Sequence, residues 1–142
     1  MSSSVRPRVA CVLWLVLLIA AGLGSRGPRM PAFCLLYVGD FLWGALFFVL
    51  YGCWWAAAPA WRVWRWAAAT TVSIELSQLC KASWLVAIRA TTCGKLLLGD
   101  TFLWSDVASV VLGATAAALV DDGYRRRRER GVRLAATPAA HI

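Results

Sequence analysis

Charged side chains are scarce in this chain of 142 residues. Asp, Glu, Lys and Arg together make up 15% of the sequence, and only seven residues are acidic. A soluble domain of this length needs a polar shell, whereas 61% of these residues are hydrophobic and the mean hydropathy is +0.65. The composition therefore argues against a soluble domain, and it predicts a membrane protein with a single domain.

The residue types of common catalytic and metal sites are also scarce. The only histidine is His141, at the far end of the sequence. The five cysteines show no C-x-x-C spacing, so neither a zinc site nor a disulfide framework is indicated. A nucleophile–base pairing and a phosphate-binding loop are missing as well. We therefore predict no catalytic residue, no metal and no cofactor.

Long apolar runs, in contrast, are abundant. A membrane-spanning helix needs about 20 mostly apolar residues, and four segments approach that length. The predicted fold class is all-α, an integral membrane four-helix bundle over residues 1–121, with a basic cytoplasmic tail at 122–142. The expected spans are about 9–24, 33–58, 63–80 and 101–120.

The basic residues set the predicted orientation. The net charge is +8, and six arginines follow the last apolar run: Arg125, Arg126, Arg127, Arg128, Arg130 and Arg133. Such a juxtamembrane cluster holds a helix end in the cytoplasm and attracts anionic lipid headgroups. We therefore expect both termini in the cytoplasm and membrane lipids as partners. Nucleic acid is not an expected partner, because the tail carries no recognisable binding motif.

The first apolar run has two interpretations. Arg6 and Arg8, followed by a short apolar segment, also fit a secretory signal peptide. However, Leu23 and Gly24 do not give the small-x-small pattern of a cleavage site. We therefore favour a retained helix, and cleavage would not alter the orientation of the other three spans.

Residues 81–100 are too interrupted to cross a membrane. An apolar stretch that begins at Trp84 gives way to a polar stretch that begins at Arg89. We predict a re-entrant or interfacial segment between the third and fourth spans, because irregular backbone is tolerated at membrane depth only under a protein or water cover. Trp84 and Trp104 are expected to anchor this segment at the membrane interface.

Five polar residues are expected to converge near the outer end of the bundle. Glu75 and Gln78 are three residues apart and share one helix face. Asp40 and Asp106 begin their spans on the outer side, and Glu75 lies about 7 Å below the outer end of its own span. Three carboxylates therefore approach one depth, below the loop that carries Arg89. We call Asp40, Glu75, Gln78, Arg89 and Asp106 the polar cluster.

The polar cluster has two competing interpretations. In the first it is structural, with Arg89 folded back onto Glu75 or Asp106, because buried charges must be paired. In the second it lines a pocket that binds an amphipathic ligand, since ionisable residues at membrane depth are functional candidates by default. A metal site made of the three carboxylates is a minor option, because no ligand-spacing motif supports it.

An ordered set of residues resembles a known family. It comprises Gly39, Asp40, Trp43, Gly44, Ala45, Glu75, Gln78, Trp84, Arg89, Ala90, Thr91, Leu98, Gly99, Phe102, Trp104, Asp106 and Gly113. The set resembles the small bacterial membrane proteins grouped as domain of unknown function 2809, from about Val9 to Asp121. The resemblance implies a multi-pass protein of the bacterial plasma membrane, and it brings no established activity. The Glu-x-x-Gln, Arg and Asp order is also similar to VanZ-like proteins, although Ser109, Val110 and Val111 stand where that pattern usually has an Asn.

Three functions follow as hypotheses. The leading one is a non-enzymatic membrane protein whose polar cluster binds a lipid-like or cell-envelope ligand, with Arg89 on its phosphate or carboxylate. The second is an assembly subunit with a purely structural cluster, whose partners are other membrane proteins or further copies of itself. Its partner surface would be a stripe of small residues on the fourth span: Asp106, Ser109, Gly113 and Ala117. The third is a small transporter or membrane enzyme.

Overall fold

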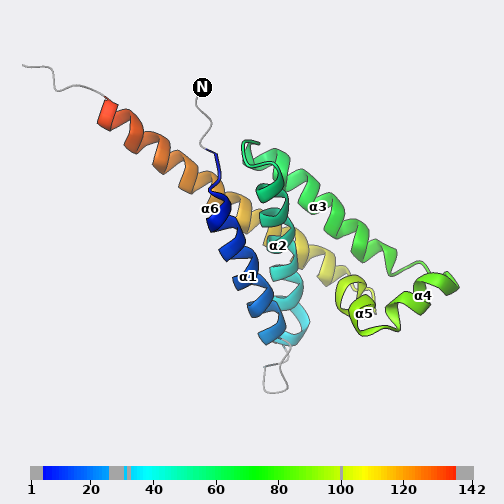
Figure 1. The fold of residues 1–142 in the computed structure, drawn as a ribbon. Coiled ribbons are helices and arrows are strands. Elements are labelled where there is room, and N and C mark those ends of the chain that lie inside the picture. Colours follow the sequence, from blue (N-terminus) through cyan, green and yellow to red (C-terminus); the bar gives the residue numbers. More distant parts are fainter. Residues whose placement is uncertain (1–4, 26–30, 32, 100, 137–142) are drawn as a thin grey trace, which may run out of the picture.

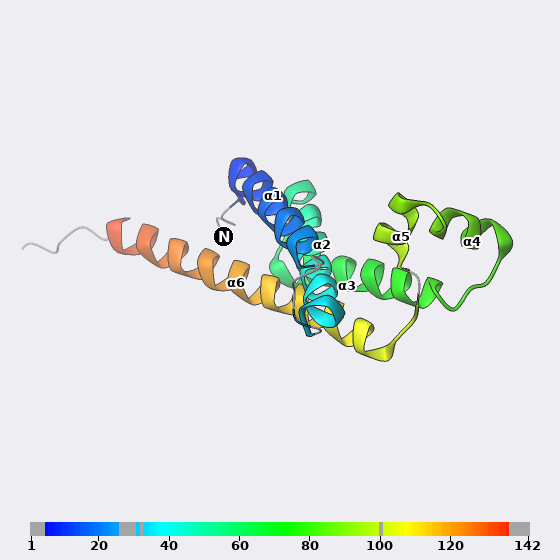
Figure 2. The ribbon, with the colours of Figure 1, turned by 90° about the horizontal axis from the view of Figure 1, so that it is seen from below.

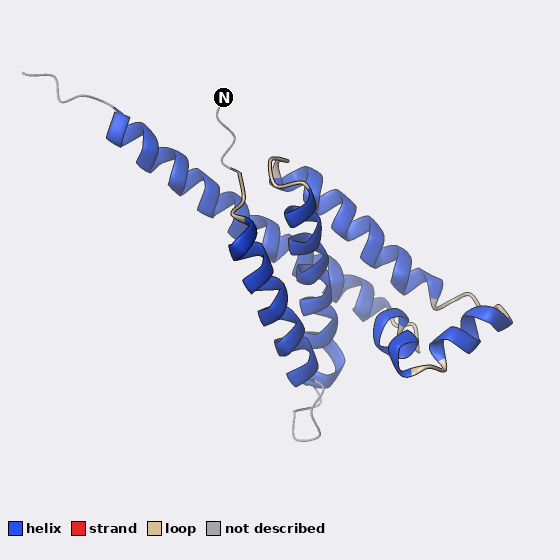
Figure 3. Cartoon of the chain, viewed as in Figure 1, coloured by secondary structure: helices blue, strands red, loops and turns tan. Residues whose placement is uncertain are grey.

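The described part of the chain is entirely helical. A computed structural model describes residues 5–25, 31, 33–99 and 101–136, and within these ranges it contains helices and loops but no strand (Figures 1 and 3). The helices are α1 (Arg8–Gly24), η1 (Cys34–Val38), α2 (Gly39–Trp54), α3 (Ala60–Ser77), α4 (Ser83–Arg89), α5 (Thr92–Leu98) and α6 (Trp104–Ala136). The all-α prediction is confirmed.

Four long helices run up and down beside one another. α1 and α2 lie side by side, α3 flanks α2, and α6 crosses behind them with its most extensive contacts on α2 and α3 (Figures 1 and 2). The two short helices α4 and α5 lie at one end, beyond the last turn of α3. The start of α1 and the C-terminal half of α6 lie at the opposite end, where α6 extends past the other helices.

Close approach of α2 and α6 depends on two glycines. A Cβ atom at Gly44 would overlap the backbone carbonyl of Val110, and one at Gly113 would overlap that of Phe41. The two backbones can therefore touch only because both positions lack a side chain. Of the small-residue stripe, Gly113 lies against α2, and Ser109 is also buried inside the fold. The partner surface of the second hypothesis stays a prediction.

A compact core lies between α2, α3 and α6. Phe48, Val63, Ala67 and Ala114 are almost fully buried there. Small side chains at two of these positions allow the helices to approach closely, and Phe48 fills the space that they leave. By contrast, α1 contributes only Cys11 to the buried set and packs mainly against α2.

The helix boundaries differ from the prediction at several ends. α3 covers residues 60–77 where 63–80 was expected, and α6 begins at Trp104 where 101 was expected. The second span was expected to run to residue 58, but α2 ends at Trp54. The basic tail was expected to begin at residue 122, yet α6 continues without a break to Ala136. Arginine is a good helix former, and an exposed Arg126–Asp122 pair at 2.7 Å spans one turn of this extension.

Of the described helices, one is a candidate membrane span by its length and composition. The stretch Trp104–Val132 of α6 is long and apolar enough to cross a membrane by length and composition, whereas Arg8–Gly24 and Gly39–Trp54 are apolar but shorter. The four-helix membrane bundle therefore stays a prediction, and it is taken up below as a proposal.

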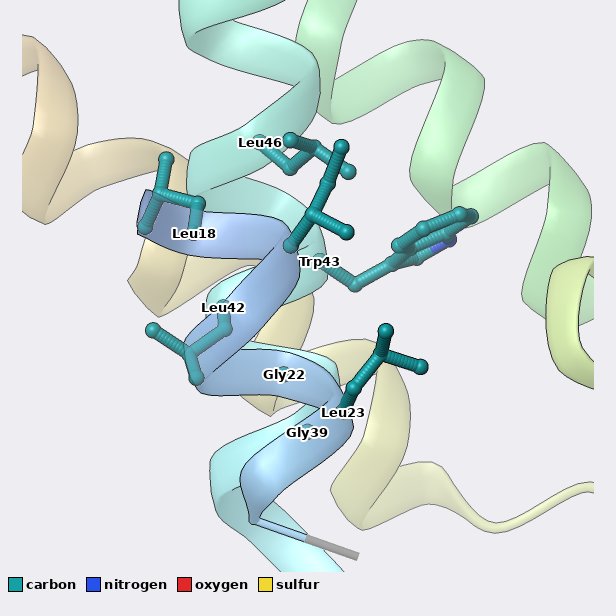
Figure 4. A pocket seen from close by; sticks show the side chains of 8 residues that line it. Leu18, Gly22, Leu23, Gly39, Leu42, Trp43 and Leu46 are labelled. Carbon is teal, nitrogen blue, oxygen red and sulfur yellow. The ribbon is translucent and has the colours of Figure 1, made fainter. Parts of the chain in front are cut away.

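The packing of α1 on α2 leaves a small apolar pocket. Figure 4 shows its lining, which includes Leu18 and Leu23 of α1 and Leu42, Trp43 and Leu46 of α2. Its volume is about 70 Å³, far below the roughly 300 Å³ at the lower end for ligand pockets. We therefore regard it as a packing gap.

Candidate polar site

Four members of the polar cluster are buried. The exposed fractions are 4% for Glu75, 4% for Gln78, 6% for Arg89 and 8% for Asp106. Asp40, in the first turn of α2, is half-buried and is not without an interaction partner. Charged side chains are rarely this buried without partners, so the hydrogen bonds of each must be accounted for.

Glu75 is held by its neighbour one turn along the chain. Gln78 Nε2 donates to Glu75 Oε2 at 2.6 Å, between two buried side chains on one face of α3. Asp40 and Asp106 both act electrostatically on the Glu75 carboxylate. The Asp40 and Asp106 carboxylates, from α2 and α6, therefore lie within electrostatic range of Glu75 in α3.

Arg89 caps the end of α3. Its guanidinium donates to the backbone carbonyls of Ser77 at 2.5 Å and Cys80 at 3.1 Å, and to Ser77 Oγ at 3.2 Å. The last carbonyls of a helix carry partial negative charge and attract a cation. This arrangement differs from the predicted pairing, since no ion pair between Arg89 and Glu75 or Asp106 is found among the described residues.

Two buried polar atoms of the cluster have no hydrogen-bond partner within the described structure. They are the acceptor Gln78 Oε1 and the donor Arg89 Nε. Gln78 lies between Ser77 and Cys80, the two residues whose carbonyls Arg89 binds, so both orphaned atoms belong to the same end of α3. Buried polar groups in proteins almost always have partners, so these two atoms are exceptions within the polar cluster.

The backbone at Gly99 supports the cluster from the α5 side. Gly99 has φ +68° and ψ −178°, a conformation that is essentially restricted to glycine. A Cβ atom at this position would also overlap the Gln78 side-chain amide. Glycine is thus required here for two reasons: the backbone conformation disfavours other residues, and a side chain would not fit beside Gln78.

Replacing Gly99 with Ala is therefore expected to destabilise the fold by about 2–3 kcal/mol, from backbone strain and displacement of Gln78. Thermal unfolding in mild detergent measures the loss. Gly22→Ala in α1 is the control, because a Cβ atom at Gly22 would meet nothing within 4 Å. Equal stability of the two variants would contradict this account of Gly99.

The two predicted interface anchors are strongly exposed. Trp84 in the first turn of α4 is 64% exposed, and Trp104 at the start of α6 is 74% exposed. Neither side chain belongs to the buried cluster. Their role at a membrane interface stays a prediction.

A second buried charge cluster was missed by the sequence analysis. Arg6 is 7% exposed, and its Nε and Nη2 atoms donate to the two carboxylate oxygens of Asp121 at 2.8 and 2.7 Å. Arg6 Nη1 donates to the Ala58 carbonyl at 2.9 Å, and Arg125 Nη1 donates to the same carbonyl at 2.8 Å. This network ties the start of α1 to α6 and to the α2–α3 connection. From the sequence, Arg6 was treated only as part of the basic flank of the first apolar run, because a bidentate partner in a distant helix leaves no local pattern.

These features define a small all-helical protein with a buried polar cluster at one end and a buried arginine–aspartate pair at the other. The sequence matches the family described as "Protein of unknown function (DUF2809)" over residues 29–114, which is more than half of the chain. The chain therefore belongs to this family, as the residue pattern predicted. No solved structure matches the chain. The similarity to VanZ-like proteins stays a prediction.

Proposed function

We propose that this chain is an integral membrane protein whose polar cluster binds the polar group of a lipid-like or cell-envelope ligand. The proposal of a ligand rests on two buried atoms that lack hydrogen-bond partners, Gln78 Oε1 and Arg89 Nε. A group with an anionic oxygen for Arg89 Nε and a hydroxyl for Gln78 Oε1 satisfies both atoms. Headgroups that combine a phosphate with hydroxyls have this chemistry.

The surface of the helices supports embedding in a membrane. Eight apolar side chains of α1 are at least half exposed, including Leu13 at 58% and Leu17 at 58%. In the most apolar window of α6 only 22% of the residues are buried, whereas the core helix of a soluble protein is mostly buried. Lipid is the solvent in which such surfaces are stable. α1 and α3, with 17 and 18 residues, are each about 26 Å long, close to the hydrocarbon thickness of about 30 Å.

Exposed tryptophans support two membrane interfaces. Trp54, Trp61 and Trp66 lie at or near the α2–α3 connection with exposures of 82%, 56% and 55%. Trp84 and Trp104 lie at the opposite end, beside α4 and α5. Aromatic belts at both headgroup levels are typical of membrane proteins. With the Arg-rich end of α6 in the cytoplasm, the polar cluster faces the outer leaflet of a multi-pass protein.

Lipid analysis of the purified protein in gentle detergent tests the ligand. Gln78→Leu removes the orphaned oxygen and leaves the Arg89 bonds to α3 in place, and Arg89→Ala removes the orphaned donor. We expect wild type to retain a specific anionic species that both variants lose. Lys81→Ala is the matched control, because Lys81 is exposed next to the cluster and is not part of it. An identical lipid profile in wild type and in a folded Gln78→Leu variant would contradict the proposal.

The second candidate is an assembly subunit with a structural cluster. The capping bonds of Arg89 favour it, because both terminal nitrogens already donate to α3. In that case Arg89→Ala lowers thermal stability and leaves the lipid profile unchanged. Gln78→Leu also removes the hydrogen bond to buried Glu75 and is expected to lower stability under both candidates, so the lipid profile distinguishes them: a folded Gln78→Leu variant loses the lipid under the first candidate and keeps it under the second.

A further inference from the structure

A groove separates α1 from α6 along the floor formed by α2. Its volume is about 480 Å³, within the range of about 300–1,000 Å³ that is usual for ligand sites. The lining is mainly apolar and comes from three helices: Cys11 and Trp14 of α1, Ala45 and Phe48 of α2, and Ala117 and Val120 of α6. Figure 1 shows α6 passing behind α1 and α2.

The groove is long and narrow. It extends along α6 from Gly113 to Arg128, a distance of about 22 Å at 1.5 Å per residue. One leaflet of a bilayer contributes about 15 Å of hydrocarbon, so an acyl chain can lie within the groove.

The end of the groove is basic. Asp121, Tyr124, Arg125 and Arg128 line it together with Arg6. Arg6 is neutralised by Asp121, and Arg125 bonds only to a backbone carbonyl. Among the described residues neither Arg125 nor Arg128 forms an ion pair. Two cations therefore remain uncompensated at the end of an apolar channel, and this pattern is complementary to an anionic headgroup on an acyl chain.

We infer that this groove is a binding site for one anionic phospholipid, with an acyl chain between α1 and α6 and the phosphate at Arg125 and Arg128. Arginine forms bidentate bonds to phosphate, and Tyr124 adds a hydroxyl donor at the same level. The site lies at the opposite end of the molecule from the polar cluster and does not depend on it. Its lipid would come from the leaflet that faces the Arg-rich end of α6.

Titration of the full chain with phosphatidylglycerol in mild detergent, followed by native mass spectrometry, tests the site. The double variant Arg125→Gln, Arg128→Gln is expected to bind phosphatidylglycerol about 30-fold more weakly than wild type, since it loses two cations near a headgroup. The double variant Arg126→Gln, Arg127→Gln has the same change in charge on the same helix and lines no part of the groove. It is expected to bind like wild type.

A second pair of variants tests the acyl chain. Ala116→Phe places a ring in the groove and is expected to abolish binding, whereas Leu119→Phe on the exposed face of α6 is not. Inorganic phosphate should not displace the lipid, and phosphatidylcholine should bind at least tenfold more weakly. Equal losses in the two arginine pairs, displacement by phosphate, or dimerisation blocked by Ala116→Phe without any lipid dependence would each overturn the inference.

Discussion

Replacing Asp121 with Ala is expected to destabilise the protein by about 3–5 kcal/mol, because it leaves the Arg6 guanidinium buried without its carboxylate. Arg6 and Asp121 side chains are 7% and 16% exposed, and their bidentate contact joins α1 to α6. The measurement is chemical unfolding in mild detergent. The double variant Arg6→Met, Asp121→Leu should recover most of the loss, since apolar side chains of similar volume replace buried ion pairs well.

The neighbouring residue supplies the control. Asp122 pairs with Arg126 at the same distance of 2.7 Å, but these side chains are 45% and 72% exposed. Exposed pairs of this kind contribute about 0.5 kcal/mol or less. Asp122→Ala should therefore be almost silent, and a loss as large as that of Asp121→Ala would show that burial is not what makes the Arg6 pair important.

Replacing Gly113 with Val is expected to cost about 3 kcal/mol or more, because its side chain would overlap the Phe41 backbone and force α2 away from α6. A backbone carbonyl has no rotamer that relieves such a clash. Gly123→Ala lies on the same helix and would meet nothing within 4 Å. That control is expected to stabilise the helix by about 0.5–1 kcal/mol. Unfolding of both variants under one set of conditions gives the comparison, and a neutral Gly113→Val would contradict the close α2–α6 contact.

Length, period and composition were sufficient to predict the helices. Apolar runs located α1, α2 and about the first half of α6. The shared face of Glu75 and Gln78 was correct because their spacing alone determines it. The interruption near Arg89 was also recognised, and it forms two short helices joined at Thr91, whose hydroxyl caps α5 by accepting from the Gly94 amide.

The partners of the two buried arginines could not be predicted from the sequence. Arg89 binds backbone carbonyls, and every residue has a carbonyl, so no residue type marks the acceptor. Arg6 binds an aspartate 115 residues away, and the periodicity of a local sequence pattern cannot predict a contact at that separation. No conformation was predicted for the basic tail, and the structure shows that α6 continues through its arginines, which favour helix.

The central claim is that this chain is embedded in a membrane, with α4 and α5 outside and the Arg-rich end of α6 inside. Labelling with a membrane-impermeant maleimide in intact cells tests it directly. One variant keeps exposed Cys93 in α5 and replaces the other four cysteines with Ser or Ala. The other variant replaces all five and carries Arg127→Cys on exposed α6. We predict labelling of Cys93 in intact cells and of the second variant only after the cells are opened. Labelling of both variants only in opened cells, together with recovery of the chain in the soluble fraction, would contradict the account.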